Sequence, residues 1–266
     1  MASIVAVTGA TGFVGREVVR QFQAAGGEVR PVGRDWSALP AADCVVHLVG
    51  IIIERGPNTF DRVHVELTRR VVDATRRAGI KRYLHMSALG TRPNAVSRYH
   101  QTKWAAEEIV RQSGLAWTIF RPSVIYGPGD KSINVLANVV RRLPVVPVLG
   151  DGEGKIQPVA VEVVAREFVR AAGDTGSVGK TFELCGPVAL TWNELYDELQ
   201  QVLGTRKPKV HLPVPVARAV AAVFEKLLRN PPFTRDQLRM LGEDNIGDPY
   251  PAGQESLAAG LRRYLC

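Results

Sequence analysis

Short apolar runs alternate with longer segments of helical periodicity through the first half of the chain. Uninterrupted or β-branched apolar runs of this length are typical of buried strands. They occupy residues 3–8, 28–33, 43–50, 81–87 and 116–122. Between them, apolar residues recur at a spacing of three or four, which predicts amphipathic helices. These helices occupy residues 15–25, 61–78 and 99–113.

The alternation predicts an α/β fold, in which helices cover both faces of a doubly wound, Rossmann-like parallel sheet. One connection departs from the pattern, because only about nine residues separate the strands at 28–33 and 43–50. A parallel crossover usually takes a dozen residues or more. We therefore expect a loop or a helical stub at this point.

The regular alternation loosens after about residue 127, where turn residues and the Pro- and Gly-rich stretch LPVVPVLGDGEG interrupt it. Thr191 and Glu194 have the spacing of a capping box, which predicts that a helix starts at Trp192 and ends at Gly204. The remaining apolar patterns predict strands at 156–161 and 180–184, and helices at 132–142, 162–172 and 211–229.

Composition narrows the class of protein. The 266 residues are 45% hydrophobic, which is enough for one full core and a smaller appendage. No apolar run reaches about 18 residues, and the N-terminus lacks the basic start of a signal peptide, so we expect no transmembrane segment. Three widely separated cysteines favour a cytoplasmic location. The net charge of +8 comes from scattered basic doublets, so we do not expect nucleic-acid binding.

Three glycines follow the first strand and open the first helix, in the stretch TGATGFVG. In this position Gly9 permits a tight turn, Gly12 allows a diphosphate to approach, and Gly15 lets the helix pack near the strand. The helix N-terminus then offers free N–H groups and a positive dipole to the phosphates. The motif therefore predicts a site for a dinucleotide.

The glycine motif suggests a division of the chain. We assign residues 1–185 to a dinucleotide-binding domain, with 127–150 contributing to a small lobe, and residues 186–266 to the C-terminal substrate or partner lobe. Open α/β sheets bind ligands along the carboxyl edge of their strands. We therefore expect the lobe to lie against that edge and to meet a small molecule that the sequence does not identify.

The end of the second strand selects the cofactor. An arginine there pairs with a 2′-phosphate, whereas an acidic residue accepts from a ribose 2′-hydroxyl. The strand ends PVGRD, with Arg34 at its tip and Asp35 next. We favour Arg34 and NADP(H); Asp35 is the competing interpretation and would favour NAD(H).

Tyr99 and Lys103 lie four residues apart in YHQTK, on one face of a predicted helix. A buried ammonium beside a phenol favours the phenolate, which would let Tyr99 act as acid or base toward a carbonyl or alcohol. Ser87 ends a strand at the same edge, where its hydroxyl could bond the same oxygen. The alternative is that Lys103 pairs with Glu107, four residues further along the helix.

The five histidines favour structural roles. His47 and His85 lie within predicted strands, where we expect buried, hydrogen-bonded imidazoles. His64, His100 and His211 have no partners at metal-ligand spacing, so we expect no metal site.

Five motifs occur in the order and spacing of a known superfamily. They are TGATGFVG, VVHLVG, GIKRYLHMSALG, YHQTK and FRPSVIYGPGD. Together they resemble the short-chain dehydrogenase/reductase superfamily over about residues 3–185, and most closely its atypical or extended branch. That branch includes proteins similar to sugar-nucleotide epimerases and the nucleotide-binding accessory subunit of respiratory complex I. The C-terminal stretch FTRDQLRMLGEDNI is similar to the latter group.

The resemblance implies a role for each matching position. Tyr99 would be the acid/base, Lys103 would bond the nicotinamide ribose, and Arg34 would take the 2′-phosphate. Ser87 is the candidate for the family's active serine. The residues implied to line the diphosphate are Gly9, Thr11, Gly12, Phe13, Val14 and Gly15. Leu48, Val49 and Gly50 would lie along the adenosine side, and Pro122, Ser123 and Val124 would meet the nicotinamide amide.

Two departures from the family pattern keep two functions open. His64 stands where the family usually carries asparagine, and Ala88 and Leu89 occupy positions where its active serine often lies. The first hypothesis is an oxidoreductase or epimerase-like enzyme that transfers hydride at a carbonyl or alcohol. The second is a non-catalytic NADP(H)-binding protein of a respiratory or quinone-biosynthesis assembly, associated with a protein complex or a membrane surface.

Overall fold

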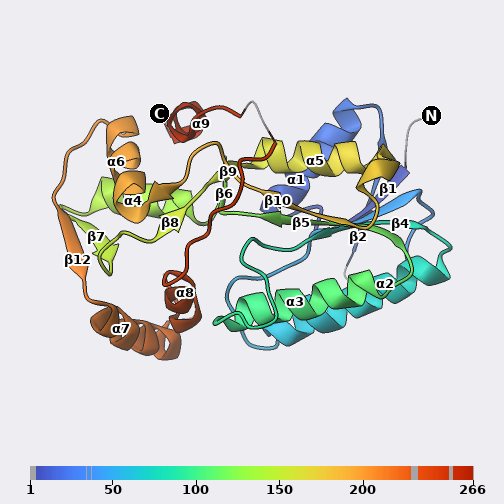
Figure 1. The fold of residues 1–266 in the computed structure, drawn as a ribbon, viewed down its shortest axis with the longest axis horizontal. Coiled ribbons are helices and arrows are strands. Elements are labelled where there is room, and N and C mark those ends of the chain that lie inside the picture. The colour runs from blue at the N-terminus through green and yellow to red at the C-terminus, as the bar shows by residue number, and fades with distance from the viewer. Residues whose placement is uncertain (1–3, 34, 37, 229–232, 252–253, 266) are drawn as a thin grey trace. The chain divides into compact units, whose positions relative to one another are not determined.

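The computed structural model describes residues 4–33, 35–36, 38–228, 233–251 and 254–265 (Figure 1). Within these residues, six strands form a central sheet in the order β10-β5-β4-β3-β1-β2. The strands from β2 to β5 pair in parallel along this order. Their bounds are β1 Ile4–Thr8, β2 Glu28–Val32, β3 Cys44–His47, β4 Arg82–Met86, β5 Ala116–Pro122 and β10 Lys180–Leu184.

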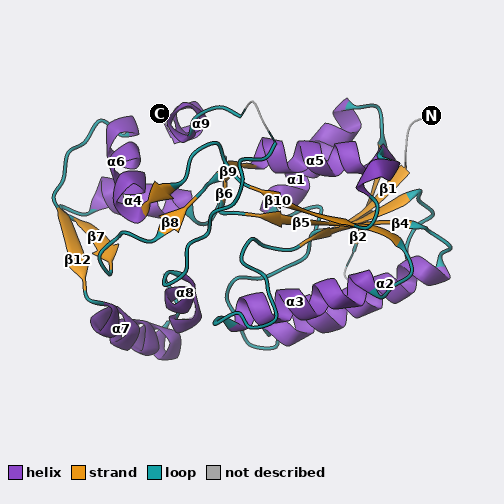
Figure 2. Ribbon diagram, in the orientation of Figure 1, coloured by secondary structure: helices purple, strands orange, loops and turns teal. Residues whose placement is uncertain are grey.

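Helices cover both faces of this sheet, as the alternation predicts. Helices α1 (Phe13–Ala24) and α5 (Val161–Gly173) pack together on one face, and α2 (Leu67–Arg77) and α3 (Arg98–Arg111) pack together on the other (Figure 2). The doubly wound, Rossmann-like fold is therefore confirmed. The predicted helix at 61–78 differs in one respect, because its first turns form a π-helix over Asp61–Glu66 before α2 begins. Single π-helical turns inside a helix occur frequently at functional sites.

The short connection between β2 and β3 contains no helix among its described residues, in agreement with the prediction. The segment nevertheless contributes to the core, since Trp36, Leu39 and Ala42 pack against buried residues that include Val45 of β3 and Val71 of α2. A loop with apolar side chains thus replaces the crossover helix for which the sequence leaves no room.

The chain divides into two compact units. The first comprises residues 1–122 and 161–183, and the second comprises residues 123–160 and 184–266. Elements of the second unit are β6 Ile125–Tyr126, α4 Ile133–Arg142, β7 Val146–Leu149, β8 Lys155–Ile156, β9 Val159–Ala160 and β11 Leu190–Thr191. They continue with α6 Trp192–Val202, β12 Lys209–Leu212, α7 Val214–Leu227, α8 Arg235–Met240 and α9 Leu257–Leu265.

The secondary structure predicted from the sequence is less accurate in the second unit. The capping box of Thr191 and Glu194 is present and starts α6 as predicted. The predicted helix at 211–229 is wrong at its start, because β12 pairs in parallel with β7 and the helix begins only at Val214. Pro213 fixes this boundary, since it lacks an N–H and its backbone is extended. The predicted strand at 156–161 is two short strands, β8 and β9.

Two buried histidines stand side by side in the sheet, on β3 and β4. His47 is hydrogen-bonded as expected, to Thr8 Oγ1 at 2.7 Å and to Thr68 Oγ1 at 3.2 Å. His85 contradicts the expectation, because neither ring nitrogen has a hydrogen-bond partner among the described residues. Its ring instead stacks on His47 at 5.4 Å, next to Tyr83. Burial lowers the pKa of both rings, that of His47 to about 3, so both imidazoles are neutral at pH 7.

Replacing His85 with Phe should stabilise the fold, because it removes a buried polar group that has no partner. The unfolded His85 binds a proton near pH 6.5 and the folded one does not, so this residue lowers stability as the pH falls below about 6.5. His85→Phe should therefore raise the free energy of unfolding by about 1 kcal/mol at pH 7, and by more at pH 5.

The measurement is urea unfolding at both pH values. His47→Phe is the matched control, and it should destabilise the protein at pH 7 because it leaves Thr8 and Thr68 without their partner. If His85→Phe and His47→Phe destabilised the protein equally, the proposed difference between the unpartnered His85 and the hydrogen-bonded His47 would be wrong.

Candidate functional site

The glycine loop between β1 and α1 is held by close backbone approaches. Gly9 has φ +73°, a conformation that side chains rarely adopt, and its carbonyl accepts the Gly12 N–H at 2.9 Å. A Cβ on Gly15 would lie 2.0 Å from that same carbonyl oxygen and 2.9 Å from Ala10. Glycine is therefore required at position 15, because α1 starts directly against the turn that ends β1.

The first turn of α1 is available to an anion. Gly12 is the N-cap and supplies no side-chain hydrogen bond, and the first turn holds no acidic residue. The backbone N–H groups of Phe13 and Val14 thus lie at a helix N-terminus whose positive dipole end has no side-chain cap. Thr11 is exposed beside them, and its carbonyl accepts from Arg16 Nη1 at 3.3 Å. Sequence reasoning missed Arg16, a cation one turn into the helix.

The segment after β3 connects this loop to α3. Leu48 donates its N–H to the carbonyl and hydroxyl oxygens of Thr8, both at 3.3 Å. A Cβ on Gly9 would contact Leu48 and Val49 at 3.3 Å, and a Cβ on Gly50 would lie 3.0 Å from Lys103 Nζ. The first unit therefore brings the glycine loop, residues 48–50 and Lys103 together at the carboxyl edge of β1 and β3.

Lys103 is almost completely buried, with 3% of its surface exposed. Its ammonium donates to the Met86 carbonyl at 3.1 Å, at the end of β4. Burial lowers the pKa of Lys103 to about 8, and the nearby Glu107 carboxylate opposes that shift. Glu107 itself is hydrogen-bonded by Arg121 at 2.7 and 2.8 Å and by Arg111 at 2.5 Å. The predicted i+4 alternative, in which Lys103 pairs with Glu107, is therefore not what the structure shows, because Glu107 pairs with Arg111 and Arg121.

Tyr99 lies one helical turn before Lys103 and is partly buried. Its ring packs edge-on against His64 at 5.4 Å and against Phe60 at 5.9 Å. Burial raises the pKa of Tyr99 to about 12. This direction is opposite to the predicted one, because burial disfavours the charged phenolate. The Lys103 ammonium donates to the Met86 carbonyl.

His64, which the sequence marks only as a departure from the family's asparagine, links two segments of the site. It lies on the π-helix, with Nδ1 2.9 Å from Thr102 Oγ1 and Nε2 within 3.2 Å of both the N–H and the carbonyl of Ile51. Burial and the Lys103 charge lower its pKa to about 2, so the ring is neutral. His64 therefore ties the segment after Gly50 to α3. In the sequence, this role is indicated only by the presence of His64 where the family usually carries asparagine.

Ser87 follows β4 directly and is buried. Its N–H donates to the Phe120 carbonyl at 2.7 Å, and its hydroxyl donates to Thr91 Oγ1 at 3.4 Å. Thr91 is equally buried and gives Ser87 a second hydroxyl as a neighbour. Sequence reasoning considered positions 88 and 89 but missed Thr91, which the turn at Gly90 returns toward Ser87.

The structure shows fewer contacts between the remaining predicted residues and the group around Lys103. Pro122 ends β5, and its carbonyl accepts the Leu89 N–H at 2.9 Å. Ser123 and Val124 belong to the second unit, where Ser123 Oγ donates to Asn245 Oδ1 at 2.7 Å. Arg34 lies outside the described residues, and Asp35 is exposed. The glycine loop, residues 48–50, Ser87, Tyr99 and Lys103 thus make up the part of the site that the first unit assembles, and this part fits a dinucleotide.

Replacing Lys103 with Met should stabilise the folded protein at pH 7, because burying an ammonium destabilises the wild type. The folded pKa of about 8 lies below the ordinary value of 10.5. This destabilisation is complete at neutral pH and disappears as the pH rises from about 8 to 10.5. We expect a gain of about 1–3 kcal/mol at pH 7 that shrinks across this window.

Urea unfolding at pH 7, 8.5 and 10 measures this difference. Lys81→Met is the control, because Lys81 is exposed and its replacement should change stability little at any of these pH values. A Lys103→Met protein that is less stable than the wild type at pH 7 would show that the bond to Met86 outweighs the burial of the charge.

The chain is similar to known proteins in both sequence and fold. Residues 36–140 match a family described as NAD(P)H-binding. NADH dehydrogenase (ubiquinone) 1 alpha subcomplex subunit 9 of Arabidopsis thaliana, a mitochondrial protein, is 30% identical over 275 residues, which cover 91% of this chain and 68% of that subunit. The ceramide reductase of Caulobacter vibrioides is 31% identical over 258 residues, covering 86% of this chain and 80% of the reductase.

A solved structure shares the complete fold. Human epimerase family protein SDR39U1, determined with NADPH, superposes with a TM-score of 0.78 and covers 98% of both chains at 21% identity. At this identity the likeness concerns the fold alone. The sequence relatives include one protein named as a subunit of an NADH dehydrogenase and another named as a reductase.

Proposed function

Since this chain belongs to the short-chain dehydrogenase/reductase superfamily and carries its NAD(P)-binding fold, we propose that it is an NADP(H)-dependent oxidoreductase or epimerase-like enzyme acting at a carbonyl or alcohol. One observation carries the proposal. Lys103 is buried at the carboxyl edge of the sheet, one helical turn from Tyr99, and its ammonium lies so close to Gly50 that a Cβ there would be 3.0 Å away. A charged group is expensive to bury, and this one lies where a ligand would meet it.

The residues of the first unit suit the parts of a dinucleotide. The first-turn N–H groups of α1 would hold the diphosphate, and Lys103, beside Gly50, would hold a ribose hydroxyl. His64 positions this segment through its bonds to Ile51. When bound, NADP(H) supplies or accepts a hydride at its nicotinamide ring. The Lys103 ammonium, with a pKa of about 8, remains mostly charged at pH 7.

Tyr99 is suited to the proton transfer that accompanies a reduction. Because burial raises its pKa to about 12, the phenol is protonated at neutral pH and can donate to the oxygen of a carbonyl. The hydroxyls of Ser87 and Thr91 form a second polar position at the end of β4, where they can orient such an oxygen.

A non-catalytic role is the second candidate, in which the cofactor is a structural ligand or redox sensor within a protein assembly. The packing of Phe60 and His64 against the Tyr99 ring supports it, because these contacts hold the phenol in an apolar environment without a substrate. The similarity to a subunit of an NADH dehydrogenase also supports it. Under this hypothesis, cofactor binding stabilises the fold by mass action and produces no turnover.

Replacing Tyr99 with Phe distinguishes these candidates. Wild type should bind NADPH, measured by its fluorescence, and should oxidise it in the presence of a carbonyl from a panel of ketones and aldehydes, including long-chain ones. Tyr99→Phe should retain NADPH binding and lose about 100-fold or more of the turnover, because the acid is absent. Tyr83→Phe is the matched control, since it removes a buried hydroxyl that has no partner among the described residues.

The alternative outcomes separate the two functions. NADPH binding without turnover on any carbonyl would favour the non-catalytic role. Turnover that survives Tyr99→Phe would keep the enzyme and exclude Tyr99 as its acid.

Replacing Arg34 with Ala tests the choice of cofactor. The substitution should weaken NADPH binding by about 1.5–3 kcal/mol and leave NADH binding unchanged, because only NADPH carries the 2′-phosphate. Asp35→Ala provides the comparison, since it should weaken NADH binding if Asp35 accepts from the ribose hydroxyl. Titration of both variants with both cofactors gives four dissociation constants. Equal losses of affinity for NADPH and NADH in Arg34→Ala would refute the assignment of Arg34 to the 2′-phosphate.

A further inference from the structure

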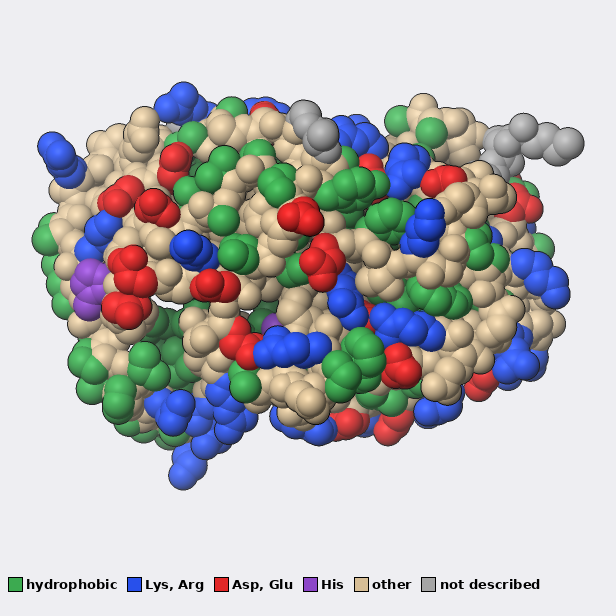
Figure 3. Space-filling model, in the orientation of Figure 1, with side chains coloured by type: hydrophobic (Ala, Val, Ile, Leu, Met, Phe, Trp, Pro, Cys, Tyr) green, Lys and Arg blue, Asp and Glu red, His purple; other side chains and the backbone are tan. Residues whose placement is uncertain are grey.

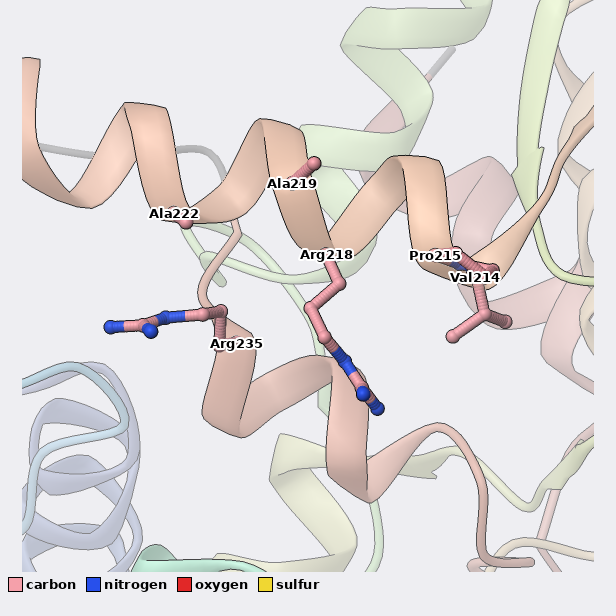
Figure 4. Close-up of a pocket in the computed structure, with 6 residues that line it drawn as sticks. All are labelled: Val214, Pro215, Arg218, Ala219, Ala222 and Arg235. Atoms are coloured by element: carbon pink, nitrogen blue, oxygen red, sulfur yellow. The ribbon is translucent and has the colours of Figure 1, made fainter.

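The surface of the protein shows less specific chemistry than its interior. Acidic and basic side chains are interspersed over the face that Figure 3 shows. The groove between α7 and α8 has a volume of about 560 Å³ and is lined by Arg218 and Arg235 (Figure 4), but Arg235 is already paired with Glu225 at 2.7 Å. Among the described helices, none is long and apolar enough to cross a membrane. A buried group in the first unit, around His64 and Lys103, has a more specific environment.

His64 lies where the π-helix meets α3. It is only 2% exposed and belongs to the π-helix Asp61–Glu66. The Phe60 ring stacks on the imidazole at 5.4 Å with 21° between the planes, and the Tyr99 ring of α3 packs edge-on at 5.4 Å. Contact with two rings in different orientations restricts the imidazole to one plane. Its two nitrogen atoms therefore point in fixed directions.

The imidazole joins two segments in either of its neutral tautomers. The Thr102 hydroxyl lies 3.0 Å from the carbonyls of Arg98 and Tyr99 in the preceding turn of α3. While it donates to this turn, it accepts from His64 Nδ1 at 2.9 Å, and Nε2 accepts the Ile51 N–H at 3.2 Å. With the proton on Nε2 instead, this nitrogen donates to the Ile51 carbonyl at 3.0 Å and Thr102 donates to Nδ1. In both tautomers His64 connects α3 to the segment after β3.

The two residues that His64 holds are the neighbours of Lys103 and Gly50. Thr102 precedes Lys103 on α3, and Ile51 follows Gly50. A Cβ on Gly50 would lie 3.0 Å from Lys103 Nζ and 3.7 Å from His64 Nε2, so both nitrogen atoms flank this glycine. Burial and the Lys103 charge lower the pKa of His64 to about 2, so the ring adds no second cation beside the ammonium.

We propose that His64 is a positioning residue for the cofactor. By holding Thr102 and Ile51, it fixes the spacing between the Lys103 ammonium and Gly50, and so determines how tightly the ribose at the nicotinamide end is bound. This assignment rests on the proposed function, in which Lys103 bonds a ribose hydroxyl. Hydrogen bonds weaken steeply outside a narrow range of distance and angle, so a donor contributes fully only when its supports are fixed.

Replacing His64 with Ala tests the assignment on two ligands, NADPH and adenosine 2′,5′-bisphosphate. The second ligand carries the adenosine and its phosphates but lacks the nicotinamide ribose. His64→Ala should weaken NADPH binding about tenfold, since a bond to a charged donor is disturbed, and should weaken bisphosphate binding less than about twofold. Isothermal calorimetry measures both affinities. Where wild type prefers NADH, NADH and ADP replace this pair.

A double-mutant cycle with Lys103→Met tests whether His64 acts through Lys103. In the Lys103→Met background, His64→Ala should change NADPH affinity by less than about twofold, because the contact that it positions is already absent. The same tenfold loss in both backgrounds would show that His64 acts independently of Lys103 and would overturn the proposal.

Conservative variants separate the two bonds of the ring. A glutamine amide reaches the position of Nε2, so His64→Gln should keep the bond to Ile51 and retain most of the NADPH affinity. An asparagine amide reaches only the position of Nδ1, so His64→Asn should keep the bond to Thr102 alone and weaken NADPH binding as His64→Ala does. Equal NADPH affinity in these two variants would overturn the proposal, including where His64→Ala fails to fold.

Val72→Ala is the control for general destabilisation. Val72 is buried in the core beneath α2, so its truncation should lower the urea midpoint and leave the affinities for both ligands unchanged. Equal losses of NADPH and bisphosphate affinity in His64→Ala would assign His64 to the fold alone and overturn the proposal. These measurements report binding, so NADPH binding without turnover would exclude the enzyme and leave the role of His64 to be decided by the same affinities. A wild type that binds neither NADPH nor NADH would overturn both.

Discussion

A series of close backbone approaches determines where the site lies. Gly15 fits against the Gly9 carbonyl, Gly9 fits against residues 48 and 49, and Gly50 fits against the Lys103 ammonium. Each approach excludes a Cβ or leaves little room for one, so the loops after β1 and β3 and the helix α3 come together at one edge of the sheet. Under the proposed function, the helix N-terminus would receive the diphosphate and the buried ammonium would hold a ribose hydroxyl.

Polar groups buried under this surface are stabilised unequally. His64 has partners at both ring nitrogens, and Glu107 has two arginines, whereas His85 has no partner among the described residues. Lys103 combines one carbonyl acceptor with burial that lowers its pKa to about 8. A group that destabilises the isolated fold at the point where a ligand would contact it is typical of a functional position, since binding can supply the missing partner.

The second unit illustrates where sequence patterns stop being sufficient. The apolar pattern over residues 211–229 predicts a helix but not its orientation, and the structure buries the alanines of α7 and exposes its valines. Composition does not reveal which face a neighbour covers. Similarly, β12 and β7 are short segments that gain their hydrogen bonds from each other, and neither has enough length to be recognised alone.

The sequence by itself determined the parallel sheet, the glycine loop, the missing crossover helix and the positions of Tyr99 and Lys103 on one helical face. These follow from periodicity, residue type and spacing, which act over a few residues. Tertiary structure alone decided that His64 binds Ile51, that Thr91 joins Ser87, and that burial raises the pKa of Tyr99. Hydrogen-bond partners and desolvation depend on residues distant in the chain, so no local pattern contains them.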